Sequence, residues 1–265
     1  MNRRIQEAFS GPGSPRLIAF LVAGDPDPEG SVRAVRALVE GGADIIELGI
    51  PFSDPVADGP TIQRADIRAL ESGTTPGKVF EIVKKVREFS DVPIVLLTYY
   101  NPVFAMGVAR FYKEAHASGV DGVLIADMPV EESAVAVEQA GIWDIDPIFM
   151  VSETTSGERL QQILAHARGF LYLVSHNGVT GSMATLPGSA GELVEKIRAE
   201  TTMPLAVGFG ISTPGHVTTL CRKGADAVIV GSAIVELVEQ HAGEPLRMQE
   251  SLATFARQMK GGSEG

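Results

Sequence analysis

The chain has 265 residues, 45% of them hydrophobic, with a net charge of −11 and a pI near 4.9. This acidic balance disfavours binding to nucleic acid or to an anionic membrane surface, because both need patches of lysine and arginine. It leaves room for a small anionic substrate, since backbone N–H groups can bind phosphate. The length suits either two small domains or one large α/β barrel.

The sequence also bounds where the protein works. Its single cysteine, Cys221, excludes an intrachain disulfide and fits a reducing compartment. Residues 1–9 are too polar to hold the apolar core of a signal peptide. No run approaches the roughly 18 apolar residues of a membrane span. We therefore expect a soluble cytoplasmic protein, with a flexible tail at about residues 261–265.

The first elements alternate between helix and strand. Residues 2–9 predict a short amphipathic helix, and the apolar run at 17–24 is typical of a buried strand. Asp27 is a predicted N-cap, with Pro28 as the first helical residue. The helix that follows is expected to end at Gly41-Gly42, where glycine favours termination.

The same strand–helix unit then recurs to the end of the chain. Further strands are predicted at 45–50, 93–100, 122–127, 146–151, 169–175, 204–210 and 227–232. Helices are predicted from 61 and at 76–89, 109–119, 131–141, 156–167, 189–200 and 213–224, with helical segments continuing to about 259.

These eight units, at a period of about 33 residues, predict one fold class. Their strands are continuously apolar, as expected when both faces are buried. We predict a (β/α)₈ TIM barrel with an extra N-terminal helix, forming a single domain over residues 1–265. A doubly wound open sheet is the competing fold, and the regular units without a change of composition disfavour it.

Two carboxylates dominate the predicted site, which in such barrels lies at the carboxyl ends of the strands. Glu47 stands at the end of an apolar run, and Asp58 follows eleven residues later in a Gly/Pro-rich loop. Burial at a strand end raises a carboxyl pKa and prepares the group for acid–base work. Asp127 also lies at a strand end, but a hydrogen bond to a loop is the favoured role for it.

Glycine-rich loops after the last strands predict a phosphate site. Residues 207–212 (VGFGIS) follow the seventh strand, and residues 230–235 (VGSAIV) follow the eighth and open a helix. Glycine lets backbone N–H groups approach an anion, and a helix N-terminus favours negative charge. The loop at 177–181 (NGVTG), after the sixth strand, adds a possible third contact at Gly181.

Other chemistries find little support. The histidines are scattered, and only His176 lies near the predicted site, so a metal centre is not expected. The strands contain no lysine, which excludes an imine mechanism in this fold. What remains is a phosphate site, two carboxylates and apolar or aromatic walls from Phe20, Leu97, Tyr99, Met150 and Phe209. A flat apolar phosphate ester converted by proton transfers fits these groups.

Several motifs together resemble the tryptophan synthase α subunit family over essentially the whole length. The most specific is ELGIPFSDPVADGPTIQ at 47–63. Others agree in order and spacing: AGDP at 23–26, YYNPVF at 99–104, GVLIADMP at 122–129, SHNGVTG at 175–181, VGFGIS at 207–212 and VGSAIV at 230–235.

The resemblance implies an activity and a role for individual residues. It implies cleavage of indole-3-glycerol phosphate, with no cofactor in this chain and a β subunit carrying pyridoxal phosphate in an α₂β₂ heterotetramer. Glu47 then corresponds to the general acid/base, Asp58 to the acceptor of the indole N–H, and Tyr172 to a neighbour of the glutamate. The phosphate binders correspond to Gly181, Phe209, Gly210, Gly231 and Ser232, and the indole pocket to Phe20, Leu97 and Met150.

The sequence leaves some points open. Glu153 places an additional carboxylate near the rim, and a solvated loop acid is the favoured interpretation. His176 lies in a variable part of the loop after the sixth strand, so the closing contacts of that loop are open. Two rival functions also remain: a phosphate-binding isomerase or lyase of another substrate, and a non-catalytic partner that only activates a β-type subunit.

Overall fold

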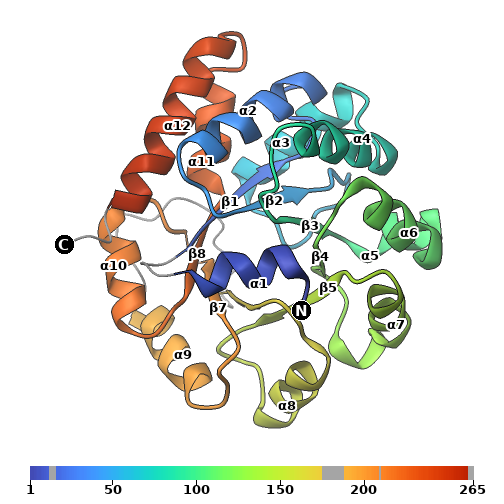
Figure 1. Ribbon diagram of the computed structural model, residues 1–265, viewed down its shortest axis with the longest axis vertical. Coiled ribbons are helices and arrows are strands. Elements are labelled where there is room, and N and C mark those ends of the chain that lie inside the picture. The colour runs from blue at the N-terminus through green and yellow to red at the C-terminus, as the bar shows by residue number, and fades with distance from the viewer. Residues whose placement is uncertain (12–15, 175–187, 209, 262–265) are drawn as a thin grey trace.

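A computed structural model describes residues 1–11, 16–174, 188–208 and 210–261. Eight parallel strands close into a barrel in sequence order, with β8 hydrogen-bonded to β1. Helices surround the barrel (Figure 1). The predicted (β/α)₈ barrel and its N-terminal helix are confirmed, and the open sheet is excluded. Among the described residues no helix is long and apolar enough to cross a membrane.

The strands lie close to their predicted positions. They are β1 (Arg16–Val22), β2 (Ile45–Gly49), β3 (Ile94–Thr98), β4 (Gly122–Ile125), β5 (Asp146–Val151), β6 (Leu171–Val174), β7 (Leu205–Gly208) and β8 (Ala227–Val230).

The helices follow the strands. They are α1 (Arg3–Ser10), α2 (Pro28–Glu40), α3 (Pro60–Glu71), α4 (Pro76–Arg87), α5 (Tyr100–Met106), α6 (Val108–Ser118), α7 (Ala134–Ile142), α8 (Gly157–His166), α9 (Gly188–Arg198), α10 (Pro214–Arg222), α11 (Ser232–Gln240) and α12 (Pro245–Gly261), with a 3₁₀ turn at Val130–Glu132. The expected Asp27 cap is confirmed, since its Oδ1 accepts from the Gly30 N–H at 2.7 Å.

One prediction was wrong at the end of the third strand. The strand predicted to reach residue 100 ends at Thr98, and Tyr100 begins helix α5, which the sequence did not predict. Pro102 sits in the first turn of α5, where its missing N–H costs no helical hydrogen bond. Asp127 supplies the cap by accepting from the Tyr100 N–H at 2.7 Å, in agreement with the loop-binding role favoured for it.

Strand side chains alternate between two cores. One set packs outward against the helices, and the other fills the barrel interior. The interior set includes Ile18, Phe20, Ile45, Val95, Leu124, Ile148, Phe170, Tyr172, Ala206 and Ile229. Because Glu47 has the same strand parity as the interior residue Ile45, its side chain also points inward.

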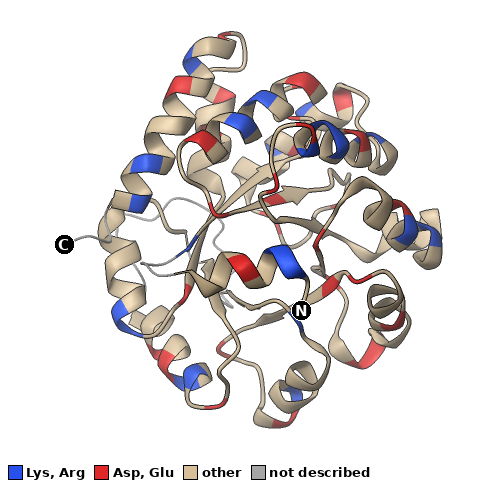
Figure 2. Ribbon diagram, viewed as in Figure 1, with Lys and Arg blue, Asp and Glu red and all other residues tan. Residues whose placement is uncertain are grey.

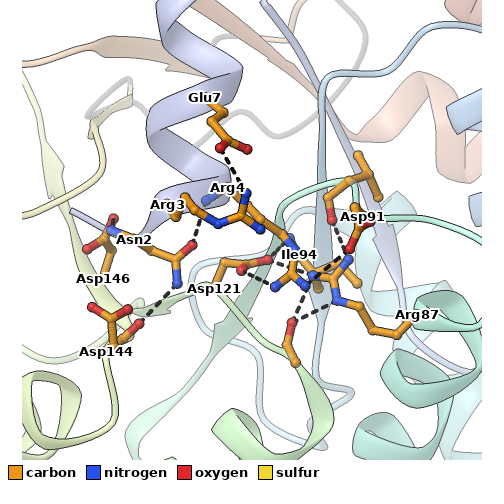
Figure 3. A network of polar contacts seen from close by, with 12 residues as sticks. Asn2, Arg3, Arg4, Glu7, Arg87, Asp91, Ile94, Asp121, Asp144 and Asp146 are labelled. Carbon is orange, nitrogen blue, oxygen red and sulfur yellow. Dashed lines mark hydrogen bonds and ion pairs between the residues drawn. The ribbon is translucent and has the colours of Figure 1, made fainter.

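Helix α1 closes the amino end of the barrel. It crosses the strands in the view of Figure 1, and its Ile5 is fully buried within the interior core. The Asn2 side chain caps the helix by accepting from the Arg4 N–H at 3.0 Å. Arg4 in turn reaches Asp121 at 3.1 Å, within the polar network of Figure 3. This end of the barrel is therefore closed by apolar packing and by ion pairs.

The outer helices carry the charge. Figure 2 shows lysine and arginine interspersed with aspartate and glutamate over their surfaces, without a large basic patch in this view.

Candidate active site

Glu47 is fully buried in the middle of β2. Burial raises the pKa of its carboxyl to about 8; Tyr172 opposes that rise and the charge of Asp58 adds to it. No group in the described part of the chain meets either carboxyl oxygen with hydrogen-bonding geometry, so the opposing effect of Tyr172 comes from proximity without a well-formed bond. Glu47 is thus protonated at neutral pH and free to transfer its proton.

The predicted indole-pocket residues share the interior with Glu47. Strand register places Phe20 beside Glu47 and Met150 beside Tyr172. Phe20 and Tyr172 belong to the interior core, and Leu97 and Met150 are partly exposed against it. The structure therefore brings these four side chains to the face of the barrel that Glu47 occupies.

Two glycines make room for this arrangement, and sequence reasoning did not single them out. A Cβ on Gly49 would lie 3.0 Å from the Phe20 ring. A Cβ on Gly208 would lie 3.0 Å from the ring of Tyr172. Both distances are shorter than ordinary van der Waals contact, so the two aromatic side chains depend on glycine at the adjacent strand positions.

Asp58 lies in the loop above β2 and is held by Tyr99. The Tyr99 hydroxyl donates to Asp58 Oδ2 at 2.8 Å and accepts from the Ala57 N–H at 3.0 Å. Burial raises the pKa of Asp58, and the Tyr99 hydrogen bond opposes the rise. The effect of Asp58 on the Glu47 pKa shows that the two carboxyl groups interact.

Two polar groups near Asp58 were missed or misjudged from sequence. Tyr99 was expected only as an aromatic wall, and Asp66 on α3 was not considered. Asp66 interrupts the buried face that α3 forms with Ile62, Ala65 and Ala69. An acid on an otherwise apolar helix face was the pattern that could have identified it. Asp25, in the bend after β1, is also buried and binds Arg68 through two hydrogen bonds of 2.7 and 2.8 Å.

The predicted phosphate site is described only in part. Gly231 is the N-cap of α11 and Ser232 its first residue, so the N–H groups of this helix end are available to an anion. Gly210 has a φ of +66°, a conformation that glycine adopts readily. Gly181 and Phe209, like His176, lie outside the described residues. Glu153 is partly buried in the turn after β5.

A separate cavity of about 330 Å³ lies between β4, β5 and the helices outside them. Its lining includes Val123, Phe149 and Ile163 from the outer core, and it shares Met150 with the predicted indole pocket. Neither Glu47 nor Asp58 lines it. The cavity therefore adjoins the predicted indole pocket at Met150 but does not contain the two carboxyl groups. In the described ranges, no three histidine, cysteine or acidic side chains are grouped to hold a metal ion.

Comparison with known proteins decides the family. The family model described as tryptophan synthase alpha chain matches residues 8–264. The chain belongs to the tryptophan synthase alpha chain family. A member from Methanoregula boonei is 56% identical over 264 residues, covering 100% of both chains. One from Methanothermobacter thermautotrophicus is 47% identical, covering 93% of this chain and 92% of the other.

Solved structures of the tryptophan synthase alpha family share the fold. The chain is 40% identical to one in a Pyrococcus furiosus tryptophan synthase complex, with a TM-score of 0.87, covering 94% of this chain and 99% of that one. Tryptophan synthase subunit alpha from Legionella pneumophila is 34% identical, with a TM-score of 0.88 and coverage of 98% and 99%. The resemblance drawn from motifs is thereby confirmed at the level of family and fold.

Proposed function

We propose that this chain cleaves indole-3-glycerol phosphate into indole and glyceraldehyde 3-phosphate, the alpha reaction of tryptophan synthase. Family membership supports the substrate, and one observation carries the chemistry. Glu47 is a fully buried carboxyl without a hydrogen-bond partner among the described residues, and it faces an interior lined by aromatic side chains.

Glu47 is the proposed acid and base. Cleavage breaks the bond between ring carbon C3 and the hydroxyl-bearing carbon of the side chain. Ring C3 must gain a proton, and the hydroxyl must lose one to become the aldehyde carbonyl. A carboxyl with a pKa of about 8 holds a proton at neutral pH and can deliver it to C3. The resulting carboxylate can then accept the hydroxyl proton.

Asp58 is the proposed partner of the indole nitrogen. Protonation at C3 spreads positive charge onto N1, and an ionised carboxylate there stabilises that charge as it develops. Tyr99 fixes one oxygen of Asp58 at 2.8 Å and favours its ionised form. The second oxygen can accept the N–H.

The remaining predicted residues are proposed to position the substrate. Gly210, Gly231 and Ser232 would hold the phosphate, together with Gly181 and Phe209. Phe20, Leu97, Met150 and Tyr172 would enclose the ring. A substrate held at its phosphate and ring presents the bond to be broken to Glu47.

We also propose a β subunit as partner, carrying pyridoxal phosphate and using the released indole, and a cytoplasmic location for both. The Pyrococcus furiosus relative belongs to a tryptophan synthase complex. In this chain, Val56 after β2 is 85% exposed and Phe104 in α5 is 64% exposed. Their elements are joined by the Ala57–Tyr99 hydrogen bond. An apolar surface beside Asp58 suits a partner that influences the site.

The deciding experiment is an indole-release assay with purified chain and indole-3-glycerol phosphate, run alone and with a tryptophan synthase β chain. We expect release in both cases and faster release with the partner. Absence of indole in both assays would reject the proposed reaction. Activation of the β chain by a Glu47→Ala/Asp58→Ala double variant would separate partner activation from catalysis.

A further inference from the structure

One buried acid has no part in the proposed chemistry. Asp66 lies on the inner face of α3, only 5% exposed, and its Oδ2 has no hydrogen-bond partner among the described residues. A buried carboxyl without a cation is costly and is retained only where something compensates for it.

The surroundings of Asp66 connect it to the site. The backbone N–H of Phe52 donates toward its carboxyl, and the charge of Asp58 acts on it directly. Phe52 begins the loop that ends at Asp58, and its ring packs 5.3 Å from that of Tyr99. Asp66 therefore touches the start of this loop, and its electrostatic field reaches the end.

The other charged groups near Asp66 do not supply a cation. Asp25 and Asp58 both raise its pKa, and no cationic side chain is among the groups acting on it. The charge of Asp66 also raises the pKa of Tyr99. Arg68, on the same helix, is bound to Asp25 and to Glu239, each at 2.7 Å. Asp66 consequently faces like charges.

Two neighbouring buried carboxyls cannot both ionise cheaply, so one of them keeps its proton. Asp58 accepts the Tyr99 hydroxyl, which favours its charged form. Burial first, and then the charge of Asp58, raises the pKa of Asp66 to about 8. Asp58 therefore ionises first, and Asp66 remains neutral at neutral pH.

We propose that Asp66 is a positioning residue for Asp58: a neutral carboxyl that anchors the loop at Phe52 and leaves Asp58 as the only charge of the pair. The functional consequence rests on the proposed alpha reaction, in which Asp58 must be ionised and fixed. The anchoring itself does not depend on that reaction.

The test compares Asp66→Leu, which removes the acceptor, with Asp66→Asn, which keeps an acceptor but cannot ionise. Asp146→Leu is the matched control, because Asp146 is also buried but lies at the amino end of the barrel. We expect Asp66→Leu to lower kcat/KM by roughly 10- to 100-fold, mainly in kcat, because Asp58 is misplaced. Asp66→Asn should restore most of that loss, and folded Asp146→Leu should keep wild-type kcat and KM.

The pH profile gives a readout that a purely structural role would not move. Ionisation of Asp66 above about pH 8 adds a like charge beside Asp58 in the wild type but not in Asp66→Asn. The ratio of kcat/KM for Asp66→Asn over wild type should therefore change between pH 7 and pH 9. Any titration of Glu47 affects both proteins and cancels in the ratio. A flat ratio would overturn the proposed ionisation.

Two measurements need no activity. The infrared carbonyl stretch of one protonated carboxyl should disappear in Asp66→Asn at pH 7. Hydrogen exchange of the Phe52 amide should be slow in wild type and Asp66→Asn and fast in Asp66→Leu. An unchanged infrared spectrum, or equal exchange in all three folded proteins, would overturn the inference. The infrared comparison does not use Asp66→Leu, so it still decides if that variant is recovered unfolded. Failure of the wild type to release indole would reject only the proposed function, because these two measurements would still stand.

Discussion

Carboxyl groups at the two ends of the barrel differ in the partners they have. At the amino end, Asp44, Asp121 and Asp226 each stand just before an even-numbered strand. Each accepts from a backbone N–H near the start of the preceding strand, at 2.7 or 2.8 Å. Each also binds a cationic side chain, which is Lys260, Arg87 or Arg198 respectively. At the carboxyl end, Asp25 binds Arg68, but no cationic side chain acts on Glu47 or Asp66 within the described ranges.

The difference separates two uses of a carboxyl group. A paired carboxylate ties adjacent strands together, and its charge is neutralised locally. A buried, unpaired one destabilises the fold but keeps a proton available or a position fixed, and such groups gather at functional sites. We therefore expect the paired carboxylates of the amino end to contribute to stability and the unpaired ones of the carboxyl end to contribute to the proposed reaction. Substitutions at each end can break this division.

The largest effect is expected at Glu47. Glu47→Gln preserves shape but removes the transferable proton, so kcat for indole release should fall by roughly 10²- to 10⁴-fold. Single-turnover assays with indole-3-glycerol phosphate would measure the loss in the chemical step. Turnover retained within a few-fold of wild type would remove Glu47 from the acid/base role.

The next effect is expected at the opposite end. Asp121 is buried and binds Arg87 at 2.6 Å and Arg4 at 3.1 Å. Asp121→Asn leaves Arg87 without its counter-charge and Arg4 with only Asp91, and should lower the free energy of unfolding by about 3 kcal/mol. Urea unfolding would measure this loss. The folded variant should keep its kcat, and a reduced kcat would contradict the separation of the two ends.

Glu47 should also lower the stability of the folded protein at high pH, because its buried carboxylate has no cationic partner among the described residues. Its folded pKa, near 8, lies above the 4.5 of the unfolded chain, so the folded state holds more protons between these values. Stability from this group is therefore lost as pH rises from about 4.5 to 8. Glu47→Gln should be more stable than wild type by on the order of a few kcal/mol at pH 8 and nearly equal at pH 4.5. Unfolding curves at both pH values would measure the gap; equal stability at pH 8 would refute the raised pKa.

The fold follows from local patterns, which explains how well the sequence predicted it. Continuous apolar runs located all eight strands, and the apolar run ending at Glu47 located the acid. The end of β3 was misplaced because its aromatic residues continue the apolar pattern into α5. Pro102 gave no warning, since the first helical turn accepts proline.

The network around Asp58 depends on contacts between residues that are distant in the sequence, so local residue spacing does not predict it. Tyr99 meets Asp58 across 41 positions, and Asp66 belongs to a helix whose remaining face is ordinary core. Strand-end position identified the buried acid Glu47, the proposed acid and base, but not the groups that hold Asp58. Packing between successive loops determines those groups, and only the three-dimensional structure shows it.

The smallest effect on activity is expected at Tyr99, which is the hydrogen-bond partner of Asp58 at the carboxyl end. Tyr99→Phe removes the hydrogen bond that favours the ionised form of Asp58 and also the acceptor for the Ala57 N–H. Kcat/KM should fall about 10-fold, as expected for losing a hydrogen bond to a charged group.

The pH dependence distinguishes this loss from simple loosening of the loop. Because the Tyr99 hydrogen bond lowers the pKa of Asp58, its removal should move the acid limb of kcat/KM to higher pH. Tyr112→Phe is the control, since Tyr112 is also buried but packs against Phe111 in the outer core. Its profile should match wild type. If the acid limb of kcat/KM for Tyr99→Phe stays at the wild-type pH, Tyr99 positions Asp58 but does not lower its pKa.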